Sequence, residues 1–330
     1  MKKIRKLFEN PVGYCLDSGH KPLRAIGEIL SDIQIKKARR IYHANREKGI
    51  TVIMTAYNSG KYIERSIKSV QEQTHEKWEL IIVDDNSTDN TWTLIENYKA
   101  KDHRISAYRA KQNMGTYFCK NFALTKAKYD LVTFQDSDDE SLPERLQIQT
   151  GFLLQRGRVA VCVRRRHYNS FKKPLRINGS YQSTALCTLM FRKDIVLNEV
   201  GYFDCVRFAA DAEFVNRLKA VFGKKNVCFV PAPLYTAFHH EKQITSSGES
   251  AHTWKQMSDT DLYFKPSDLR QEYHQHFESF HRHIKSKITS PFIDFPPPAT
   301  RSHPIKLPPG MERPLIKNNK DFGIRYFSDL

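Results

Sequence analysis

Between residues 50 and 134 short apolar runs alternate with helical runs, and this alternation constrains the fold more than any other feature of the sequence. Four runs read as strands: Ile50–Thr55, Glu79–Val83, Arg104–Tyr108 and Leu131–Phe134. Three segments between them read as helices: Lys61–Gln73, Thr91–Lys101 and Thr116–Lys126. Continuously apolar strands separated by helices of this length indicate a mostly parallel sheet that is flanked by helices on both faces. The sequence therefore predicts an α/β fold.

The chain beyond Pro143 follows a less regular pattern. Its expected elements are a helix over Glu144–Gln155, a strand over Val159–Val163, a basic loop at Arg164–Arg166, an apolar stretch at Ala185–Phe191, a helix from Asp211 to Phe222 and a strand over Val227–Val230. We expect these elements to complete one domain over residues 50–250, with a first half at 50–142 and a second half at 143–250.

Two extensions flank the expected domain. Residues 1–49 hold 12 basic and 5 acidic residues and contain a basic amphipathic helix, Leu23–Asn45, that could pack on the domain or rest on a membrane surface. Residues 251–330 open with a His-rich helix over Leu269–Ile284 and continue into a tail in which eight of the 15 prolines fall between residues 291 and 314. Proline breaks helices and central strands, so this tail should be extended, either wrapped around the domain or mobile.

Composition narrows the classes of function but leaves several open. The 53 Lys and Arg residues exceed the 36 Asp and Glu residues, and the formal net charge of +17 suits nucleic acid, an anionic membrane or phosphate-bearing substrates. No apolar stretch approaches the roughly 20 residues of a membrane-spanning helix, and the basic start of the chain lacks the apolar core of a signal peptide. The six scattered cysteines are typical of reduced cytosolic thiols.

Acidic residues follow two of the expected strands. Asp84-Asp85 comes after one strand, and Asp136-Ser137-Asp138-Asp139 comes after another. Because the carboxyl ends of parallel strands meet at one edge of a sheet, both clusters should lie together and need a cation or hydrogen bonds. Sparse carboxylates completed by substrate phosphates suit Mg²⁺ or Mn²⁺. The alternative is helix capping, which we expect for Asp89 before Thr91.

The sequence lacks the glycine-rich motifs that hold nucleotide phosphates by backbone amides. No Gly-x-Gly-x-x-Gly and no Gly-x-x-x-x-Gly-Lys-Ser/Thr follows a strand. Dinucleotide-dependent redox chemistry and P-loop hydrolysis are therefore disfavoured. A site that binds phosphate through a metal ion fits better.

At this point the sequence resembles the family 2 glycosyltransferases with the GT-A fold. Four segments match the family's motifs in the right order: Ile53–Asn58, Ile81–Asp89, Asn113-Met114-Gly115 with Lys120-Asn121, and Phe134–Asp139. The resemblance covers about residues 50–245 and implies a Rossmann-like sheet, a nucleotide-binding half over 50–142 and an acceptor-binding half over 143–250. The phrases Gly115–Phe118 and Pro143-Glu144-Arg145 are most similar to bacterial enzymes that build capsule or other surface polysaccharide.

The resemblance assigns roles to the residues of the first half. Base and ribose would be held by Thr55, Tyr57 and Asp85, with Asp85 accepting a hydrogen bond from a uracil-type imide. Lys120, which stands where Arg is more usual, would approach the diphosphate. Asp136 would face the ribose or the sugar, and Asp138 would ligate the metal.

The second half carries two further segments of the family. Gly201–Asp204 and Ala210–Phe214 are similar to segments that contain the catalytic base, which would be Asp211, with Ala210 where Glu is usual. Near the end of the last strand, His240 has the spacing of a residue that reaches the metal or diphosphate, with Phe238 where Arg is usual. One base and one displacement imply inversion at the anomeric carbon.

The sequence thus predicts a cytoplasmic, Mn²⁺- or Mg²⁺-dependent inverting glycosyltransferase that moves a hexosyl or N-acetylhexosaminyl group from a nucleotide-diphosphate sugar, most simply a UDP-sugar, to a glycan or lipid-linked acceptor. Residues 1–49 could touch the inner face of the membrane. Two alternatives stay open. The charge and the segment Arg164–Tyr168 suggest a basic nucleic-acid-binding protein, although we expect no nucleic acid partner, whereas Ala210 and Phe238 suggest an inactive nucleotide-sugar-binding homologue. Four histidines of the His-rich helix should be solvated: His274, His276, His281 and His283.

Overall fold

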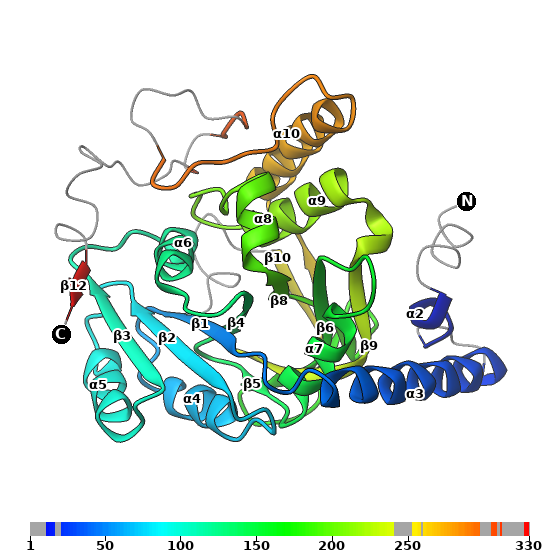
Figure 1. Ribbon diagram of the computed structural model, residues 1–330, viewed down its shortest axis with the longest axis horizontal. Helices are drawn as coiled ribbons and strands as arrows, with labels where there is room; N and C mark the ends of the chain where they lie inside the picture. The colour runs from blue at the N-terminus through cyan, green and yellow to red at the C-terminus, as the bar shows by residue number, and fades with distance from the viewer. Residues whose placement is uncertain are drawn as a thin grey trace.

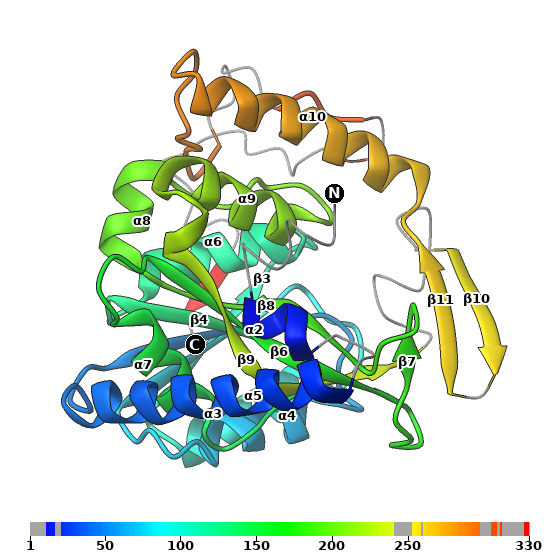
Figure 2. The same ribbon diagram turned by 90° about the vertical axis from the view of Figure 1, so that its right-hand side faces the viewer.

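A computed structural model describes residues 11–16, 21–240, 253–258, 260–297, 305–308, 311 and 327–329 of the chain. A twisted nine-stranded sheet lies at the centre of the molecule, with helices above and below it, and a three-stranded sheet extends to one side (Figures 1 and 2). Among the described residues, no helix is long and apolar enough to span a lipid bilayer.

The large sheet runs in the order β12-β3-β2-β1-β4-β8-β6-β9-β5. Its strands are β1 Ile50–Ala56, β2 Trp78–Asp84, β3 Ile105–Ala110, β4 Leu131–Asp136, β5 Glu140–Ser141, β6 Ala160–Asn169, β8 Gln182–Arg192, β9 Val227–His239 and β12 Phe327–Asp329. Strands β1, β2, β3, β4, β6 and β9 share one direction, and β5, β8 and β12 oppose it. The sheet is therefore mostly parallel. The small sheet pairs β10 Thr253–Ser258 with β11 Asp261–Lys265, and β11 with β7 Arg176–Ile177.

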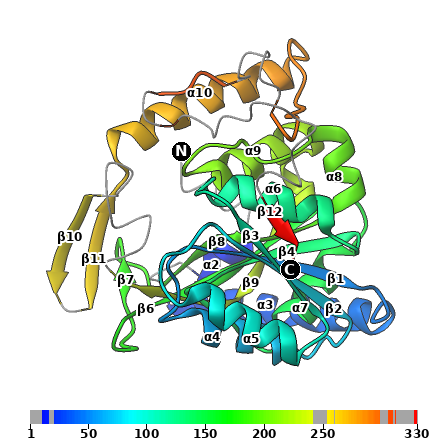
Figure 3. The ribbon, with the colours of Figure 1, turned by 90° about the vertical axis from the view of Figure 1, so that its left-hand side faces the viewer.

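Helices cover both faces of the large sheet, as Figures 1 and 3 show. The helices are α2 Pro11–Leu16, α3 Lys21–His43, α4 Ile63–Gln71, α5 Thr91–Lys101, α6 Thr116–Lys126, α7 Arg145–Leu153, α8 Lys193–Val200, α9 Ala210–Phe222 and α10 Asp268–Lys285. One core packs α3, α4, α5 and α7 against the sheet, and a second core packs α6, α8, α9 and α10 against the opposite face. In β2, Leu80 and Ile82 enter the first core while Ile81 and Val83 enter the second. This alternation is the reason that the strand is apolar throughout.

The expected α/β class with a mostly parallel sheet is confirmed, and the boundaries of most elements fall within a few residues of the expected ones. The expected basic loop at Arg164–Arg166 is wrong, because these residues pair with β8 and β9 inside β6. Arg164 is buried and donates to Gln182 at 3.2 Å, which leaves it unsuited to a nucleic-acid surface. Strand β9 also continues past two prolines to His239, where the sequence suggested an end at Val230.

Elements of the C-terminal extension pack on the domain. Helix α10 contacts α9. The Tyr273 hydroxyl donates to Asp204 at 2.7 Å, and the His281 ring lies 2.9 Å from a Glu213 oxygen that also pairs with Arg217. The expectation that all four helix histidines are solvated is therefore wrong for His281, which is buried. The periodicity of a polar helix did not reveal that one of its faces meets a buried carboxylate.

Helix α3 approaches α7 so closely that backbone meets backbone. A Cβ atom added at Gly151 of α7 would lie 2.0 Å from the Ala38 carbonyl oxygen of α3. We expect Gly151→Ala to lower the free energy of unfolding by about 1–3 kcal/mol through overpacking, despite the better helix propensity of alanine, which is worth about 1 kcal/mol. Thermal or urea unfolding checks this. The reverse change at an exposed helix position, Ala100→Gly, serves as the propensity control, and a Gly151→Ala protein more stable than the wild type would contradict the contact.

Candidate active site

The carboxyl ends of β1, β2 and β4 place the sequence motifs side by side. Thr55 of β1 lies opposite Val83 of β2 and Asp136 of β4 in the parallel register. Asp84 is the last residue of β2 and pairs with Ala56. The two acidic clusters therefore share one edge of the sheet, as predicted. Asp89 accepts the Thr91 backbone N–H at 3.0 Å at the start of α5, as expected of a capping side chain, although the N-cap position itself is Asn90.

Asp85 lies in a buried pocket of backbone amides. One carboxylate oxygen accepts the Met114 N–H at 2.6 Å and the other accepts the Gly115 N–H at 2.9 Å. Gly115 has φ +87°, which favours glycine and explains the Asn-x-Gly motif in this loop. Burial raises the pKa of Asp85 to about 6, although both amide bonds oppose the shift. Each oxygen keeps a second lone pair, so the carboxylate can still accept a hydrogen bond from a ligand.

The other two residues assigned to the base and ribose lie at the same edge. The Thr55 hydroxyl is 2.7 Å from the Thr116 hydroxyl at the start of α6, which joins the first motif to the Asn-x-Gly loop. The Tyr57 side chain is half exposed in the loop after β1. Thr55 and Asp85 therefore both contact the segment 113–116. The Tyr57 ring, in the loop directly after β1, is accessible to solvent.

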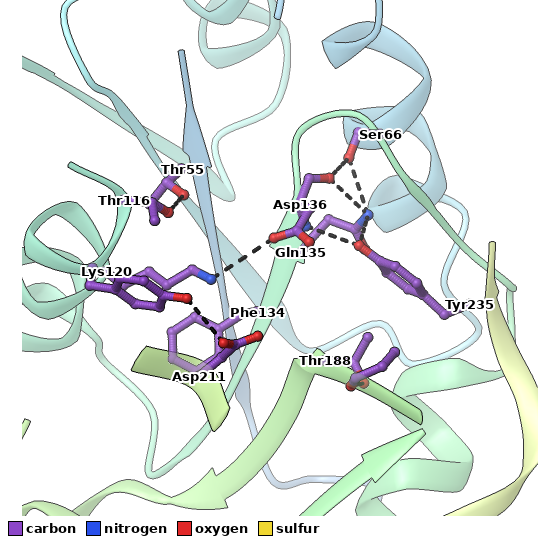
Figure 4. Close-up of polar contacts among 12 residues, drawn as sticks. Thr55, Ser66, Thr116, Lys120, Phe134, Gln135, Asp136, Thr188, Asp211 and Tyr235 are labelled. Carbon is purple, nitrogen blue, oxygen red and sulfur yellow. Dashed lines mark hydrogen bonds and ion pairs between the residues drawn. The ribbon is translucent and has the colours of Figure 1, made fainter. Parts of the chain in front are cut away.

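Lys120 and Asp136 form the centre of the site (Figure 4). The Lys120 Nζ atom is 3.9 Å from an Asp136 oxygen and lies over the rings of Tyr117 and Phe134 at 5.4 Å and 5.3 Å. Burial raises the pKa of Asp136, and the positive charge of Lys120 opposes that rise. Lys120 is thus a buried cation over an aromatic floor that these two rings form, and the family resemblance predicts a diphosphate near it.

Asp211 reaches the same region from the opposite half of the domain. It lies in the first turn of α9, and its Oδ1 atom accepts the Tyr117 hydroxyl at 3.1 Å. Since Lys120 also contacts the Tyr117 ring, a continuous path of contacts joins Asp136, Lys120, Tyr117 and Asp211. Figure 4 shows the carboxylates of Asp136 and Asp211 on either side of Lys120.

Asp138 and His240 meet although 102 residues separate them in the sequence. The His240 Nε2 atom lies 3.0 Å from Asp138 Oδ2, and both side chains are mostly buried. His240 Nδ1 is also buried and has no hydrogen-bond partner among the residues that the structure describes. Two ligands in adjacent positions around an octahedral Mg²⁺ or Mn²⁺ ion are about 3 Å apart, given metal–ligand distances near 2.1 Å. The spacing of this pair therefore fits a shared divalent ion.

Two residues that the sequence did not single out hold this pair. The Tyr62 ring stacks on His240 with centroids 4.2 Å apart, and the Arg65 guanidinium donates to the Asp138 carbonyl oxygen. The Arg65 guanidinium carbon also lies 3.8 Å from the centroid of the Phe238 ring. Phe238 occupies the sequence position at which the resemblance predicts Arg. Both residues lie at the start of α4, on no motif, so only the three-dimensional structure connects them with the site.

A second group of ligand atoms lies beside the first. The residues Asp136, Asp139 and Cys187 place one ligand atom each within 4.8 Å of one another, and they are the group of this kind found in the described part of the chain. Asp139 accepts the Phe238 backbone N–H at 3.0 Å, and burial together with the neighbouring carboxylates raises its pKa well above the usual range. Cys187 lies in no motif and about 50 residues from Asp136 and Asp139 along the chain, so the sequence did not indicate that its thiol would approach these carboxylates.

Comparisons with known proteins agree with this architecture. Residues 51–210 match the sequence model of Glycosyl transferase family 2. TuaG of Bacillus subtilis, a glycosyltransferase named for teichuronic acid biosynthesis, is 39% identical over 107 residues, which are 32% of this chain and 42% of TuaG. WfgD of Escherichia coli, named as a UDP-Glc:alpha-D-GlcNAc-diphosphoundecaprenol beta-1,3-glucosyltransferase, is 34% identical over 106 residues, 32% of this chain and 41% of WfgD.

Among solved structures, Staphylococcus aureus TarS 1–349 in complex with UDP-GlcNAc aligns with a TM-score of 0.49 and 25% identity, covering 61% of each chain. The matched segments of the curated relatives span less than half of their own length. The range of the family model, residues 51–210, contains the motifs that follow β1, β2 and β4. The segment 51–210 of this chain therefore belongs to Glycosyl transferase family 2.

Proposed function

We propose that this chain is a metal-dependent inverting glycosyltransferase that uses a nucleotide-diphosphate sugar, specifically a UDP-sugar, to extend a glycan or a lipid-linked acceptor of a bacterial surface polysaccharide. The observation that carries the proposal is the meeting of Asp138 with His240 next to Lys120, Asp136 and Asp211. Residues 50–142 would bind the donor and 143–250 the acceptor. WfgD, which is named for a UDP-Glc donor and a diphosphoundecaprenol-linked acceptor, supports this donor and acceptor class.

The donor's uracil would lie against Asp85, whose ionised carboxylate accepts the imide N–H, and its diphosphate would lie near Lys120. Asp138 and His240 would hold the divalent ion, which stabilises the negative charge of the departing diphosphate. Lys120 is buried beside aromatic rings, so its charge acts on that diphosphate with little screening by water. Asp136, which lies 3.9 Å from Lys120 and two residues before Asp138, would face the ribose or the sugar.

The acceptor hydroxyl would approach from the side of Asp211. This carboxylate would remove the proton as the hydroxyl attacks the anomeric carbon, while the bond to the diphosphate breaks. The Tyr117 hydroxyl donates to Asp211 and fixes its orientation. One displacement from the face opposite the leaving group inverts the anomeric centre.

A panel of nucleotide sugars tests the proposal. UDP-glucose, UDP-GlcNAc, GDP-mannose and dTDP-glucose would each be incubated with the protein and Mn²⁺, and the release of nucleotide diphosphate would be measured, with and without EDTA. We expect one or more UDP-sugars to be consumed only when the metal is present. Metal-dependent binding of a nucleotide sugar without release of its nucleotide diphosphate would instead support the inactive homologue, and release that survives EDTA would contradict the metal site.

The pKa of Asp85 predicts a pH dependence of base recognition. Only the ionised carboxylate accepts the imide N–H, and with a pKa of about 6 the ionised fraction falls from nearly complete at pH 7.5 to about one tenth at pH 5. We expect the affinity for uridine, measured without metal by calorimetry or ligand NMR, to fall about tenfold over this range. N3-methyluridine lacks the imide proton and is the matched control. Equal affinities for uridine at both pH values would place the base elsewhere.

A further inference from the structure

The outer side of α3 carries a row of apolar side chains that nothing in the described structure covers. Ile26, Ile29, Leu30 and Ile33 are 49%, 61%, 37% and 58% exposed. Their spacing of three and four residues places them on one side of the helix. The opposite side, with Gly27, Ser31, Ala38 and Tyr42, is buried against the rest of the protein. We call the four exposed residues the apolar stripe.

The same side of α3 becomes basic toward its C-terminal end. Lys36, Lys37 and Arg40 are exposed and continue the stripe at the same helical spacing. Of the exposed acids of this helix, Glu28 lies away from the stripe and is paired with Arg24 at 3.2 Å, whereas Asp32 lies at the edge of the stripe, three residues after Ile29 and four before Lys36. The apolar stripe and its basic continuation, Lys36, Lys37 and Arg40, therefore form one amphipathic surface with three cations and a single carboxylate at its edge.

We propose that this surface of α3 binds an anionic lipid membrane. A helix that lies in the membrane interface buries an apolar face among the acyl chains and directs Lys and Arg toward lipid phosphates. The 23-residue helix runs along the outside of the molecule in Figure 2, so it can lie flat on a surface along its length. The sequence ahead of it adds Lys2, Lys3, Arg5 and Lys6. The inference does not depend on the proposed function.

The charges favour a lipid surface over the other occupants of an exposed helix face. A second copy of the chain would bring an identical surface of net positive charge, which offers one carboxylate for three cations. A nucleic acid would pair with Lys36, Lys37 and Arg40 but would leave the apolar stripe in water. An anionic membrane satisfies both parts of the surface, because its acyl region takes the isoleucines and its phosphates take the cations.

The test is co-sedimentation of the full chain with two kinds of vesicles, phosphatidylcholine alone and phosphatidylcholine with about 30 mol% phosphatidylglycerol, at physiological salt. We expect binding to the anionic vesicles only, weakening as salt is raised. Lys36→Gln/Lys37→Gln/Arg40→Gln should lower the partition coefficient about 100-fold, at about fivefold for each cation. Ile26→Gln/Ile29→Gln/Ile33→Gln should lower it at least about 100-fold, since each isoleucine loses most of its burial.

Matched controls separate this surface from overall charge. Lys101→Gln/Lys225→Gln/Lys285→Gln removes the same number of exposed cations elsewhere and should bind like the wild type. Unchanged circular dichroism and melting temperature would show that each variant folds. Equal binding to neutral and anionic vesicles, or full binding by the isoleucine variant, would overturn the proposal. A wild-type dimer that the isoleucine variant converts to monomer, without vesicle binding, would assign the surface to a second copy.

Discussion

Asp138→Ala is expected to abolish metal-dependent binding of the nucleotide and to lower sugar transfer by about 1000-fold. The variant removes one of the two side chains that meet 3.0 Å apart at the proposed metal position. A divalent ion stabilises the charge of the departing diphosphate by several kcal/mol, and about 4 kcal/mol corresponds to that factor. Calorimetric titration of UDP with and without Mn²⁺ measures the binding, and UDP release measures the transfer.

The experiment also distinguishes the two groups of ligand atoms at the acidic edge. If the metal is held by Asp138 and His240, then Cys187→Ser should leave the Mn²⁺ affinity within a factor of about three, because the ion does not touch the thiol. If the ion instead lies among Asp136, Asp139 and Cys187, Cys187→Ser should weaken Mn²⁺ binding more than Asp138→Ala does, and our assignment is wrong. Glu96→Ala, at an exposed position of α5, controls for the loss of a carboxylate.

The fold of residues 50–142 and the acidic edge of their sheet could be predicted from the sequence, because the signals for them are local. A buried parallel strand such as β2 is apolar throughout, and the chain then turns polar where the strand leaves the core, at Asp84 and Asp85. The parallel topology alone then brings Asp85 and Asp136 to one edge. The contact of Asp138 with His240 was expected only from the family resemblance, since His240 follows the last strand of the sheet and no local pattern ties it to Asp138.

The residues that the sequence did not predict were missed for a different physical reason. Tyr62 and Arg65 act through tertiary contacts, a stacked ring and a bond to a backbone carbonyl, which leave no period in the sequence. The three consecutive arginines Arg164–Arg166 predict a loop, because charged residues are rare in buried strands, yet they lie within β6. Here the Arg164 guanidinium is satisfied by Gln182 of the neighbouring strand β8. Burial of paired polar groups overrides composition at these positions.

Asp211→Asn is expected to leave donor binding within about twofold of the wild type and to lower turnover by about 1000-fold. The side chains of Asp and Asn have nearly the same shape, and Asn can still accept the Tyr117 hydroxyl that lies 3.1 Å from Oδ1. What the variant loses is the ability to take a proton, and a general base contributes about 10²–10⁴ to a rate. Parallel measurements of the UDP-sugar affinity and of kcat separate the two effects.

If Asp211 has a purely structural role, Asp211→Asn should impair donor binding and turnover together. As a residue of the first turn of α9, it could stabilise the helix alone through its charge, worth about 0.3–1 kcal/mol. In that case Asp211→Asn would lower the melting temperature slightly and reduce binding and turnover together. Tyr117→Phe supplies the matched comparison, because it removes the hydrogen bond to Asp211 but keeps the carboxylate and the aromatic floor under Lys120. It should cost turnover far less than Asp211→Asn does, since proton removal stays possible when the base is only less well oriented.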